Sequence, residues 1–357
     1  MPPAIPLTRT TQPKSKPRDD QLGFGEIFTD HMFVMDGSAD QGWHDPRIVP
    51  YGPLSLDPST AVLHYGQAVF EGIKAYRSVQ DTIVLFRADK SAERLNRSAQ
   101  RLCMPQIEED VFVSALKSLI AVDRDWVPRA AGTSLYIRPT MIAADPYLGV
   151  RPSQTYTFFV ILSPVGAYYA EGFNPVKILV EDRYVRSVKG GMGEAKTGGN
   201  YAASLLAGEE AHRQGYSQVL WLDGLERRYI EEVGSMNIAF MIDDRLVTPA
   251  LNGNILAGIT RDTVLQLATD WGIPVVERSI TIDEVLTAAG NGHLQEVFGT
   301  GTAAVISPVS ELFYKGHTIT INDGRVGRVA QRLFDEISGI QRGLKPDPHG
   351  WLMEVEG

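Results

Sequence analysis

A lysine surrounded by glycines is the residue with the clearest capacity for covalent chemistry. Lys196 lies within Gly-Glu-Ala-Lys-Thr-Gly-Gly-Asn-Tyr, residues 193–201, and two further glycines stand at positions 190 and 191. A lysine amine attacks an aldehyde only when it is neutral, a state that burial and nearby cations favour. The glycines let the backbone come close to a planar ring. Because a glycine-flanked lysine by itself is more typical of a surface loop, the Schiff-base interpretation depends on the motifs that accompany it.

Two adjacent acids form a second motif, in Tyr-Ile-Glu-Glu-Val-Gly-Ser-Met-Asn at residues 229–237. A pyridoxal ring withdraws electrons while its ring nitrogen stays protonated, and a carboxylate at that nitrogen holds the proton. In an extended segment Glu231 and Glu232 point to opposite faces, so only one of them reaches the ring. Glu232 leads into the apolar Val-Gly stretch and is favoured. The alternative is a solvated acid at the edge of a strand.

A phosphate-binding turn is the third motif. Residues 256–262, Leu-Ala-Gly-Ile-Thr-Arg-Asp, bring Gly258, Ile259 and Thr260 to the start of a predicted helix. Backbone N–H groups and the positive end of the helix dipole attract a phosphate there. Many helices begin with Gly-x-Thr, so this motif is weak when taken alone.

A second Gly/Thr turn and an arginine would complete the phosphate site. Residues 298–304, Phe-Gly-Thr-Gly-Thr-Ala-Ala, carry hydroxyls at Thr300 and Thr302. The arginine fork matches the geometry of a phosphate. Three arginines share one face of a predicted helix, and composition does not choose among them: Arg94, Arg97 and Arg101.

Several other classes of protein are disfavoured. There is no Gly-x-x-x-x-Gly-Lys-Ser/Thr run and no Gly-x-Ser-x-Gly run, which argues against a P-loop and an α/β-hydrolase. The formal net charge of −9 argues against a nucleic-acid or anionic-membrane partner. The seven histidines form no ligand pair, so no metal is expected. The single cysteine, Cys103, allows no internal disulfide and is predicted to be a core thiol.

The length of 357 residues favours two domains. We expect a disordered N-terminal arm at residues 1–20, an N-terminal α+β domain at 21–165 and a linker at 166–175. A C-terminal domain at 176–357 would carry the lysine. No apolar run reaches the roughly 20 residues that cross a bilayer.

Hydrophobic periodicity predicts the elements of both domains. Strands are expected at residues 82–86, 134–142, 156–162, 176–180, 218–222, 237–242, 245–248 and 275–280. Helices are expected at residues 89–102, 111–126, 201–214, 260–271, 282–289 and 327–342. Thr260 is expected to be the N-cap of its helix, and residues 296–308 to pass through a Gly/Thr-rich loop.

Taken together, these motifs resemble branched-chain amino-acid aminotransferases, which are fold-type IV pyridoxal-phosphate enzymes. The segments at 196–204, 231–237, 258–262 and 296–304 carry the resemblance in the second half. Segments at 28–32, 63–76 and 135–140 carry it in the first half, and the ending at 339–343 and 349–351 is similar to bacterial members. The resemblance covers roughly residues 22–357. It implies an α/β (α+β) architecture with a smaller N-terminal domain, a larger C-terminal domain and the cofactor at their interface.

For the cofactor, pyridoxal 5'-phosphate, the resemblance implies a role for each matching residue. Lys196 forms the internal aldimine and shuttles the proton. Glu232 pairs with the ring nitrogen, Tyr201 binds the phenolic oxygen, and Arg94 is the phosphate-binding arginine. The other phosphate contacts come from Ile259, Thr260 and Thr302.

For the substrate, the resemblance implies an apolar pocket with a carboxylate site. Arg138 would receive the distal carboxylate of glutamate, and Ser235 with the Thr302–Ala303 backbone would hold the α-carboxylate. Position 235 carries Thr or Gly in many members. The aromatic side chains of the pocket wall would be Phe24, Tyr65, Phe70, Tyr136 and Tyr168. Ala304 and Ser307 stand where some animal members carry a Cys-x-x-Cys pair, so no thiol switch is expected there.

The implied reaction is transamination from L-leucine, L-isoleucine or L-valine to 2-oxoglutarate, giving a branched 2-oxo acid and L-glutamate. A cytoplasmic homodimer is expected, with small-molecule substrates as its other partners. Two alternatives remain open. One is a D-amino-acid aminotransferase or an aminodeoxychorismate lyase of the same fold, and the other is a pyridoxal-phosphate carrier or regulator without turnover.

Overall fold

Two compact units make up the chain in the computed structural model, which describes residues 5–166 and 173–356. The first unit consists of Met1–Tyr168 with two later segments, Ala195–Gly198 and Gly339–Gly357. The second unit consists of Tyr169–Glu194 and Gly199–Ser338. The division therefore differs from the predicted C-terminal domain at 176–357, because the lysine segment and the C-terminal segment both belong to the first unit.

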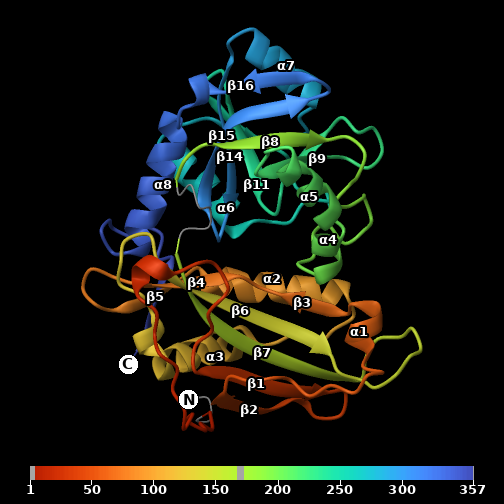
Figure 1. Ribbon diagram of the computed structural model, residues 1–357, viewed down its shortest axis with the longest axis vertical. Coiled ribbons are helices and arrows are strands. Elements are labelled where there is room, and N and C mark those ends of the chain that lie inside the picture. The colour runs from red at the N-terminus through yellow and green to blue at the C-terminus, as the bar shows by residue number, and fades with distance from the viewer. Residues whose placement is uncertain (1–4, 167–172, 357) are drawn as a thin grey trace. The chain divides into compact units, whose positions relative to one another are not determined.

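An antiparallel sheet is the centre of the first unit, in the order β17-β5-β4-β6-β7-β1-β2, and β3 pairs with β6 (Figure 1). The strands are β1 His31–Ser38, β2 Gly42–Pro50, β3 Ala68–Phe70, β4 Ile73–Arg77, β5 Ile83–Phe86, β6 Ser134–Ala143, β7 Thr155–Val165 and β17 Leu352–Val355. The strands predicted at 82–86, 134–142 and 156–162 match β5, β6 and β7.

Two helices cover this sheet, α2 Ala88–Arg101 and α3 Glu109–Val122. A third, α1 Ala61–Tyr65, is a single short turn. Short 3-10 helices lie at Asp19–Gln21 and Arg124–Trp126. The apolar stripe predicted for α2 is buried at Ala92, Leu95 and Ala99, in one core with residues of α3 and of the strands. The buried stripe fixes the rotation of α2 about its axis. This rotation matters because α2 carries the proposed phosphate arginine and contacts the segment of Lys196.

The N-terminal arm is ordered from residue 5 to residue 20, so the prediction of disorder is wrong there. Leu7 forms a parallel bridge with Ile48. The backbone of Lys14 donates to Asp30 at 2.8 Å, and its ammonium lies 2.8 Å from the carbonyl oxygen of Thr29. These partners lie at least 15 positions away in the sequence, where composition alone does not reveal them.

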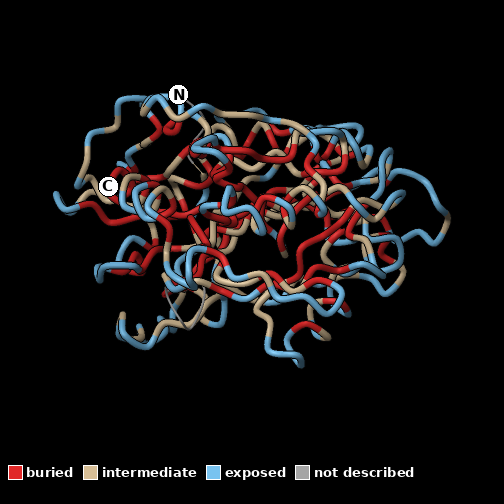
Figure 2. Tube along the Cα trace, turned by 90° about the horizontal axis from the view of Figure 1, so that it is seen from above, coloured by how far each residue is buried: buried red, intermediate tan, exposed pale blue. Residues whose placement is uncertain are grey.

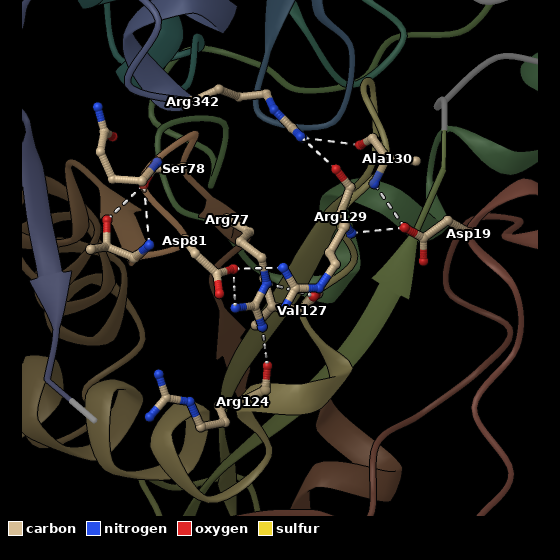
Figure 3. A network of polar contacts seen from close by, with 11 residues as sticks. Asp19, Arg77, Ser78, Asp81, Arg124, Val127, Arg129, Ala130 and Arg342 are labelled. Carbon is tan, nitrogen blue, oxygen red and sulfur yellow. Dashed lines mark hydrogen bonds and ion pairs between the residues drawn. The ribbon is translucent and has the colours of Figure 1, made fainter.

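The C-terminal segment is bound to the first unit by one arginine and by strand pairing. β17 pairs antiparallel with β5. Arg342 donates to the carbonyl oxygens of Arg129 and Ala130 at 2.8 Å and 3.1 Å (Figure 3). Asp19 accepts hydrogen bonds from the backbone N–H groups of the same two residues, each at 2.7 Å. The turn at residues 129–130 therefore binds both the N-terminal arm, through Asp19, and the C-terminal segment, through Arg342.

A mixed sheet forms the second unit, in the order β10-β9-β8-β15-β14-β11-β12-β13, with β16 paired to β15. Three of its pairs are parallel: β15 with β8, β8 with β9, and β12 with β13. The strands are β8 Val176–Glu181, β9 Gln218–Leu222, β10 Ile230–Val233, β11 Asn237–Ile242, β12 Arg245–Thr248, β13 Val275–Glu277, β14 Leu294–Gly301, β15 Val305–Tyr314 and β16 His317–Thr320. The mixture of parallel and antiparallel pairs agrees with the predicted α/β class.

The helices are α4 Gly198–Ala202, α5 Leu205–Arg213, α6 Ile259–Asp270, α7 Ile282–Gly290 and α8 Arg328–Gln341, with a 3-10 turn at Asn322–Gly324. Most predicted elements are present. Buried and exposed stretches alternate along the trace (Figure 2). No described helix is long and apolar enough to cross a membrane.

Four local predictions are corrected. The helix predicted at 201–214 is two helices, α4 and α5. The N-cap of α6 is Gly258 rather than Thr260. Residues 296–308, expected as a loop, lie mainly in β14 and β15, because the glycines of this stretch are accommodated in strands packed on other side chains. Cys103 is exposed, directly after the end of α2, rather than a core thiol.

Arg342→Ala tests the attachment of the C-terminal segment. Removing hydrogen bonds from a charged donor to backbone carbonyls should lower the free energy of unfolding by about 2 kcal/mol. Urea unfolding followed by circular dichroism measures the change. Arg325→Ala, which removes only an exposed pair with Asp323, is the control and should change stability by less than about 0.5 kcal/mol. Equal effects of the two substitutions would contradict the prediction.

Candidate active site

The backbone of Lys196 is held on both sides by the first unit. Its N–H donates to Ser98 Oγ at 2.9 Å, and its carbonyl accepts from the N–H of Phe70 at 3.0 Å. Next along the chain, Thr197 Oγ1 donates to the carbonyl of Ala68 at 2.8 Å. The Lys196 ammonium lies 5.1 Å from the centroid of the Phe70 ring. The lysine segment is thus bound between α2 and β3.

Of the three candidate arginines on α2, only Arg94 is buried. Its Nε and Nη2 donate to the two carboxylate oxygens of Glu71 at 2.7 Å and 2.8 Å. The Glu71 side chain is fully buried and that of Arg94 is 5% exposed. Arg97 and Arg101 are exposed. Burial thus distinguishes Arg94 from the other two arginines, and its phosphate-binding role stays a prediction.

Arg94 and Ser98 lie one helical turn apart, on the same face of α2. Ser98 binds the backbone of Lys196, so the helix fixes the spacing between the buried guanidinium and the lysine. Glu71 follows Phe70, the residue that binds the Lys196 carbonyl. Glu71 lies in the segment at 63–76 that carries the resemblance, but the sequence predicted no role for it or for Ser98.

Aromatic side chains and an arginine gather on β6 and beside it. The rings of Phe24 and Tyr136 lie 5.1 Å apart. Arg138 donates to Tyr136 Oη at 3.0 Å, and its guanidinium lies 4.7 Å from the centre of the Phe70 ring. Arg138 Nε is buried without a hydrogen-bond partner among the described residues. A Cβ on Gly72 would lie 2.3 Å from Tyr136 Oη, so a glycine is required there.

One residue predicted for the pocket wall does not join this group, and another is not among the described residues. Tyr65, at the end of α1, is exposed, and its hydroxyl donates to the carbonyl of Leu148. Tyr168 lies outside the described residues. The structure thus brings together Phe24, Phe70, Tyr136 and Arg138 within the first unit.

Glu232 lies on β10 in the second unit and is buried. Its Oε2 lies 2.7 Å from Arg186 Nε. Its Oε1 accepts from the N–H of Leu256 at 3.1 Å and from Asn237 Nδ2 at 3.2 Å. Arg186 is a site residue that no sequence motif indicated, because its partner is distant in the chain. A buried carboxylate with this arginine partner is suited to remain charged.

The neighbouring Glu231 has different partners, as the alternation of a strand predicts. Asn254 Nδ2 donates to its Oε1 at 2.6 Å. Both glutamates are buried, so neither is a solvated acid at a strand edge. Burial raises the pKa of Glu231 above its ordinary value, against the lowering effect of the Asn254 hydrogen bond.

The turn before α6 is closely packed, and its N-cap residue, Gly258, has no side chain that could cap the helix. A Cβ on Gly258 would lie 1.9 Å from Asn237 Oδ1, so only glycine fits. Ile259 and Thr260 are the first residues of the helix, at the positive end of its dipole. This is the arrangement that binds phosphate at many helix starts.

The turn between β14 and β15 lies beside the turn between β10 and β11. Met236 fills the space over Gly299 and Gly301, where a Cβ would approach its side chain to 2.9 Å and 3.0 Å. Ser235 is exposed in the one turn, and Thr302 and Ala303 are half-buried in the other. Tyr201 lies on α4 and is half-buried.

The residues present suit a pyridoxal phosphate. A lysine held by its backbone, a buried carboxylate, a buried arginine and a glycine-bounded helix start supply the four kinds of group that the cofactor needs. Within residues 5–166 and 173–356, no cluster of three or more His, Cys, Asp or Glu side chains is arranged to hold a metal ion.

Comparisons with known proteins agree with this chemistry. The family model of class IV amino-transferases matches residues 68–312, so the chain belongs to that family of pyridoxal-phosphate-dependent enzymes. Branched-chain-amino-acid aminotransferase 2 of Bacillus subtilis (strain 168) is 59% identical over 351 residues, covering 98% of this chain and 96% of the relative. The predicted resemblance to branched-chain aminotransferases is therefore confirmed.

Solved structures show the same fold. The branched-chain amino acid aminotransferase of Escherichia coli has a TM-score of 0.76 at 31% identity, covering 91% of this chain and 99% of that chain. The T.th. branched-chain amino acid aminotransferase, determined with pyridoxamine 5'-phosphate, has a TM-score of 0.76 at 30% identity, covering 91% and 98%. The predicted fold class is confirmed.

Glu71→Ala tests the buried ion pair of the first unit. Removal of the carboxylate deprives buried Arg94 of its Glu71 partner, which should lower the free energy of unfolding by about 3–5 kcal/mol. Urea unfolding measures it. Glu93→Ala removes a half-buried carboxylate of α2, the helix that carries Arg94, where it pairs with Lys90 and Arg97, and should cost less than about 1 kcal/mol. A loss below about 1 kcal/mol for Glu71→Ala would show that the pair is dispensable.

Proposed function

We propose that this chain transfers the amino group of L-leucine, L-isoleucine or L-valine to 2-oxoglutarate, with Lys196 as its catalytic residue. The observation that carries the proposal is the fixed backbone of Lys196 on α2 and β3, in a chain 59% identical to a branched-chain aminotransferase. When both peptide groups of a lysine are hydrogen-bonded, only its side chain can rotate. The amine therefore returns to the same position in each catalytic cycle.

Each proposed cofactor residue has its own task. When bound, pyridoxal phosphate supplies an electron sink that weakens the bonds at the substrate α-carbon. The Lys196 amine takes the α-proton and returns it, as base and then acid. Glu232 keeps a proton on the ring nitrogen, and Tyr201 donates to the phenolic oxygen. Arg94, the start of α6 at Ile259 and Thr260, and Thr302 bind the phosphate.

One pocket must accept an apolar side chain and a carboxylate in turn. The rings of Phe24, Phe70 and Tyr136 offer apolar surface to a branched side chain. Arg138, whose buried Nε has no protein partner among the described residues, offers a fork to the distal carboxylate of glutamate. Ser235 and the backbone at Thr302–Ala303 are proposed to hold the α-carboxylate of either substrate.

We also propose a cytoplasmic homodimer. Support for the dimer comes from apolar side chains on α1 and on the connection between β6 and β7. The most exposed are Leu63, Tyr65, Tyr147, Leu148 and Val150. Contiguous exposed apolar surface of this kind favours association. A second copy would cover it and would bring Tyr65 toward a neighbouring pocket, as expected for the aromatic wall.

Lys196→Ala should abolish turnover, because no other group replaces the amine that moves the α-proton. We expect the rate of glutamate formation from L-leucine and 2-oxoglutarate to fall by roughly a thousandfold or more. Lys189→Ala alters an exposed lysine in the same glycine-rich region and should leave the rate unchanged. Substantial residual turnover in Lys196→Ala would refute the assignment of the catalytic residue.

The cofactor absorption band of the unaltered enzyme separates the alternatives. A shift on addition of L-leucine supports the proposal. A shift with D-alanine but not with L-leucine would instead favour a D-amino-acid aminotransferase. A band that responds to no amino acid would favour a carrier or regulator.

Arg138→Met should separate the two substrates. The loss of the guanidinium should raise the KM for 2-oxoglutarate at least tenfold, which corresponds to about 1.4 kcal/mol, because a carboxylate loses a charged partner. The KM for L-leucine should change less than threefold, since its side chain is apolar. Arg97→Met, on the exposed face of α2, is the control. Equal increases in both KM values would show that Arg138 does not discriminate between the substrates.

A further inference from the structure

One buried contact beside the proposed ring-nitrogen site contains two atoms without a hydrogen-bond partner. They are Glu231 Oε2 and Asn254 Oδ1, and the statement holds for the described residues. The two residues are 2% and 5% exposed. Their other two polar atoms are already joined, since Asn254 Nδ2 donates to Glu231 Oε1 at 2.6 Å. A buried polar atom without a partner is costly, and here both belong to one pair.

The protonation of Glu231 decides whether both atoms can be satisfied. An ionised carboxylate only accepts hydrogen bonds, and Asn254 Oδ1 also only accepts, so neither oxygen can satisfy the other while Glu231 is ionised. A neutral carboxylic acid carries an O–H donor. It then pairs with a primary amide through two hydrogen bonds, one in each direction. Exchanging the amide oxygen and nitrogen of Asn254 does not remove this requirement, because an amide oxygen would then face the other Glu231 oxygen.

We propose that Glu231 is a neutral carboxylic acid that donates its proton to Asn254 Oδ1, and that this acid–amide pair positions the carboxylate of Glu232. The second half of the statement rests on the proposed function, in which Glu232 meets the ring nitrogen. Glu231 is therefore a positioning residue, because it acts through its neighbours and not on the substrate.

The backbone of Asn254 carries the effect to Glu232. Its carbonyl accepts from Ser187 Oγ at 2.9 Å and from Arg186 Nη2. Arg186 Nε lies 2.7 Å from Glu232 Oε2. A Cβ on Gly193 would lie 2.0 Å from the Asn254 carbonyl oxygen, so the segment that leads to Lys196 packs directly against it.

Leu256, two residues beyond Asn254, supplies the second hold on Glu232. Its N–H donates to Glu232 Oε1 at 3.1 Å. A displacement of Asn254 would therefore move both the arginine and the peptide group that orient the Glu232 carboxylate. The same connection ends at Gly258, where α6 begins.

The charges around Glu231 agree with a neutral acid. Burial is the largest influence and raises its pKa, and the Asp223 carboxylate raises it further. The Asn254 hydrogen bond and the Arg186 guanidinium act in the opposite direction. If both adjacent glutamates were ionised, the single charge of Arg186 would be shared between two carboxylates. A neutral Glu231 leaves that charge to Glu232.

Infrared difference spectroscopy of the holoenzyme tests the protonation state. The spectrum of the unaltered protein minus that of Glu231→Gln at neutral pH should contain the C=O band of a protonated carboxylic acid, shifted in heavy water. A carboxylate band in its place would overturn the proposal. Glu209→Gln, at an exposed position on α5, should show only the loss of a carboxylate. This measurement requires no turnover, so its result does not depend on whether the proposed substrates are correct.

Stability against pH provides a second, independent readout. The ordinary pKa of the carboxyl is 4.5 and is raised in the folded protein. The unaltered protein should therefore lose stability relative to Glu231→Gln as the pH rises above 4.5, until the pH passes the raised pKa. We expect the difference in Tm to keep growing beyond pH 7. A difference that stops growing below pH 7 would mean that Glu231 is ionised at neutral pH, contrary to the proposal.

Two variants test the positioning role. Glu231→Gln preserves one donor and one acceptor toward Asn254, so the cofactor absorption band, its pH dependence and kcat should be retained. Asn254→Ala removes the pair and should weaken cofactor retention at least about fivefold, the equivalent of one hydrogen bond, and shift the pH dependence of the band. Unchanged retention and pH dependence in Asn254→Ala, or an equal defect in Glu231→Gln, would refute the role.

Discussion

The backbone of Lys196 is fixed by two hydrogen bonds within the first unit, and the proposed catalytic role of this lysine depends on them. The N–H binds Ser98 and the carbonyl binds the Phe70 N–H. The residues before Ala195 and after Gly198 belong to the second unit, so the lysine segment is a short stretch of the first unit within the chain of the second. Both hydrogen bonds form only if the Phe70 N–H on β3 and the Ser98 hydroxyl on α2 lie at a fixed distance from each other. That spacing is set by the apolar stripe of α2, buried in the core of the first unit.

Two buried carboxylates of the proposed site, one in each unit, are each paired with an arginine. Glu71 is paired with Arg94, and Glu232 with Arg186. Taking an isolated charge out of water is expensive, whereas a paired and hydrogen-bonded charge is tolerated. These pairs also fix the direction of each arginine fork. The third buried acid of the group, Glu231, has an amide as its nearest partner, and a neutral acid suits an amide better than a carboxylate does.

Glycines at the site act by what they exclude. Gly258 leaves room for Asn237, Gly193 for the Asn254 carbonyl, and Gly72 for the Tyr136 hydroxyl. In each case a Cβ would overlap a polar atom of a residue that hydrogen-bonds another site residue. The glycine-rich character of the sequence around Lys196 thus reflects close packing of backbone on polar groups as well as access to a planar ring.

The chemistry and most of the elements could be predicted from local patterns in the amino-acid sequence. Lys196, the adjacent glutamates and the Gly-Ile-Thr turn are such patterns, and the 3.6-residue and two-residue periods placed α2, α3 and most strands, because these signals arise between near neighbours.

Partners distant in the sequence could not be predicted in this way. Burial of Arg94 against Glu71, the choice among three arginines, Arg186 at Glu232, and Asn254 at Glu231 all depend on tertiary packing. The same holds for the ordered N-terminal arm, the strands at residues 296–308 and the assignment of both the lysine segment and the C-terminus to the first unit. Each of these depends on hydrogen bonds or ion pairs across long stretches of chain, whose energies are decided by burial, and burial exists only once the chain has folded.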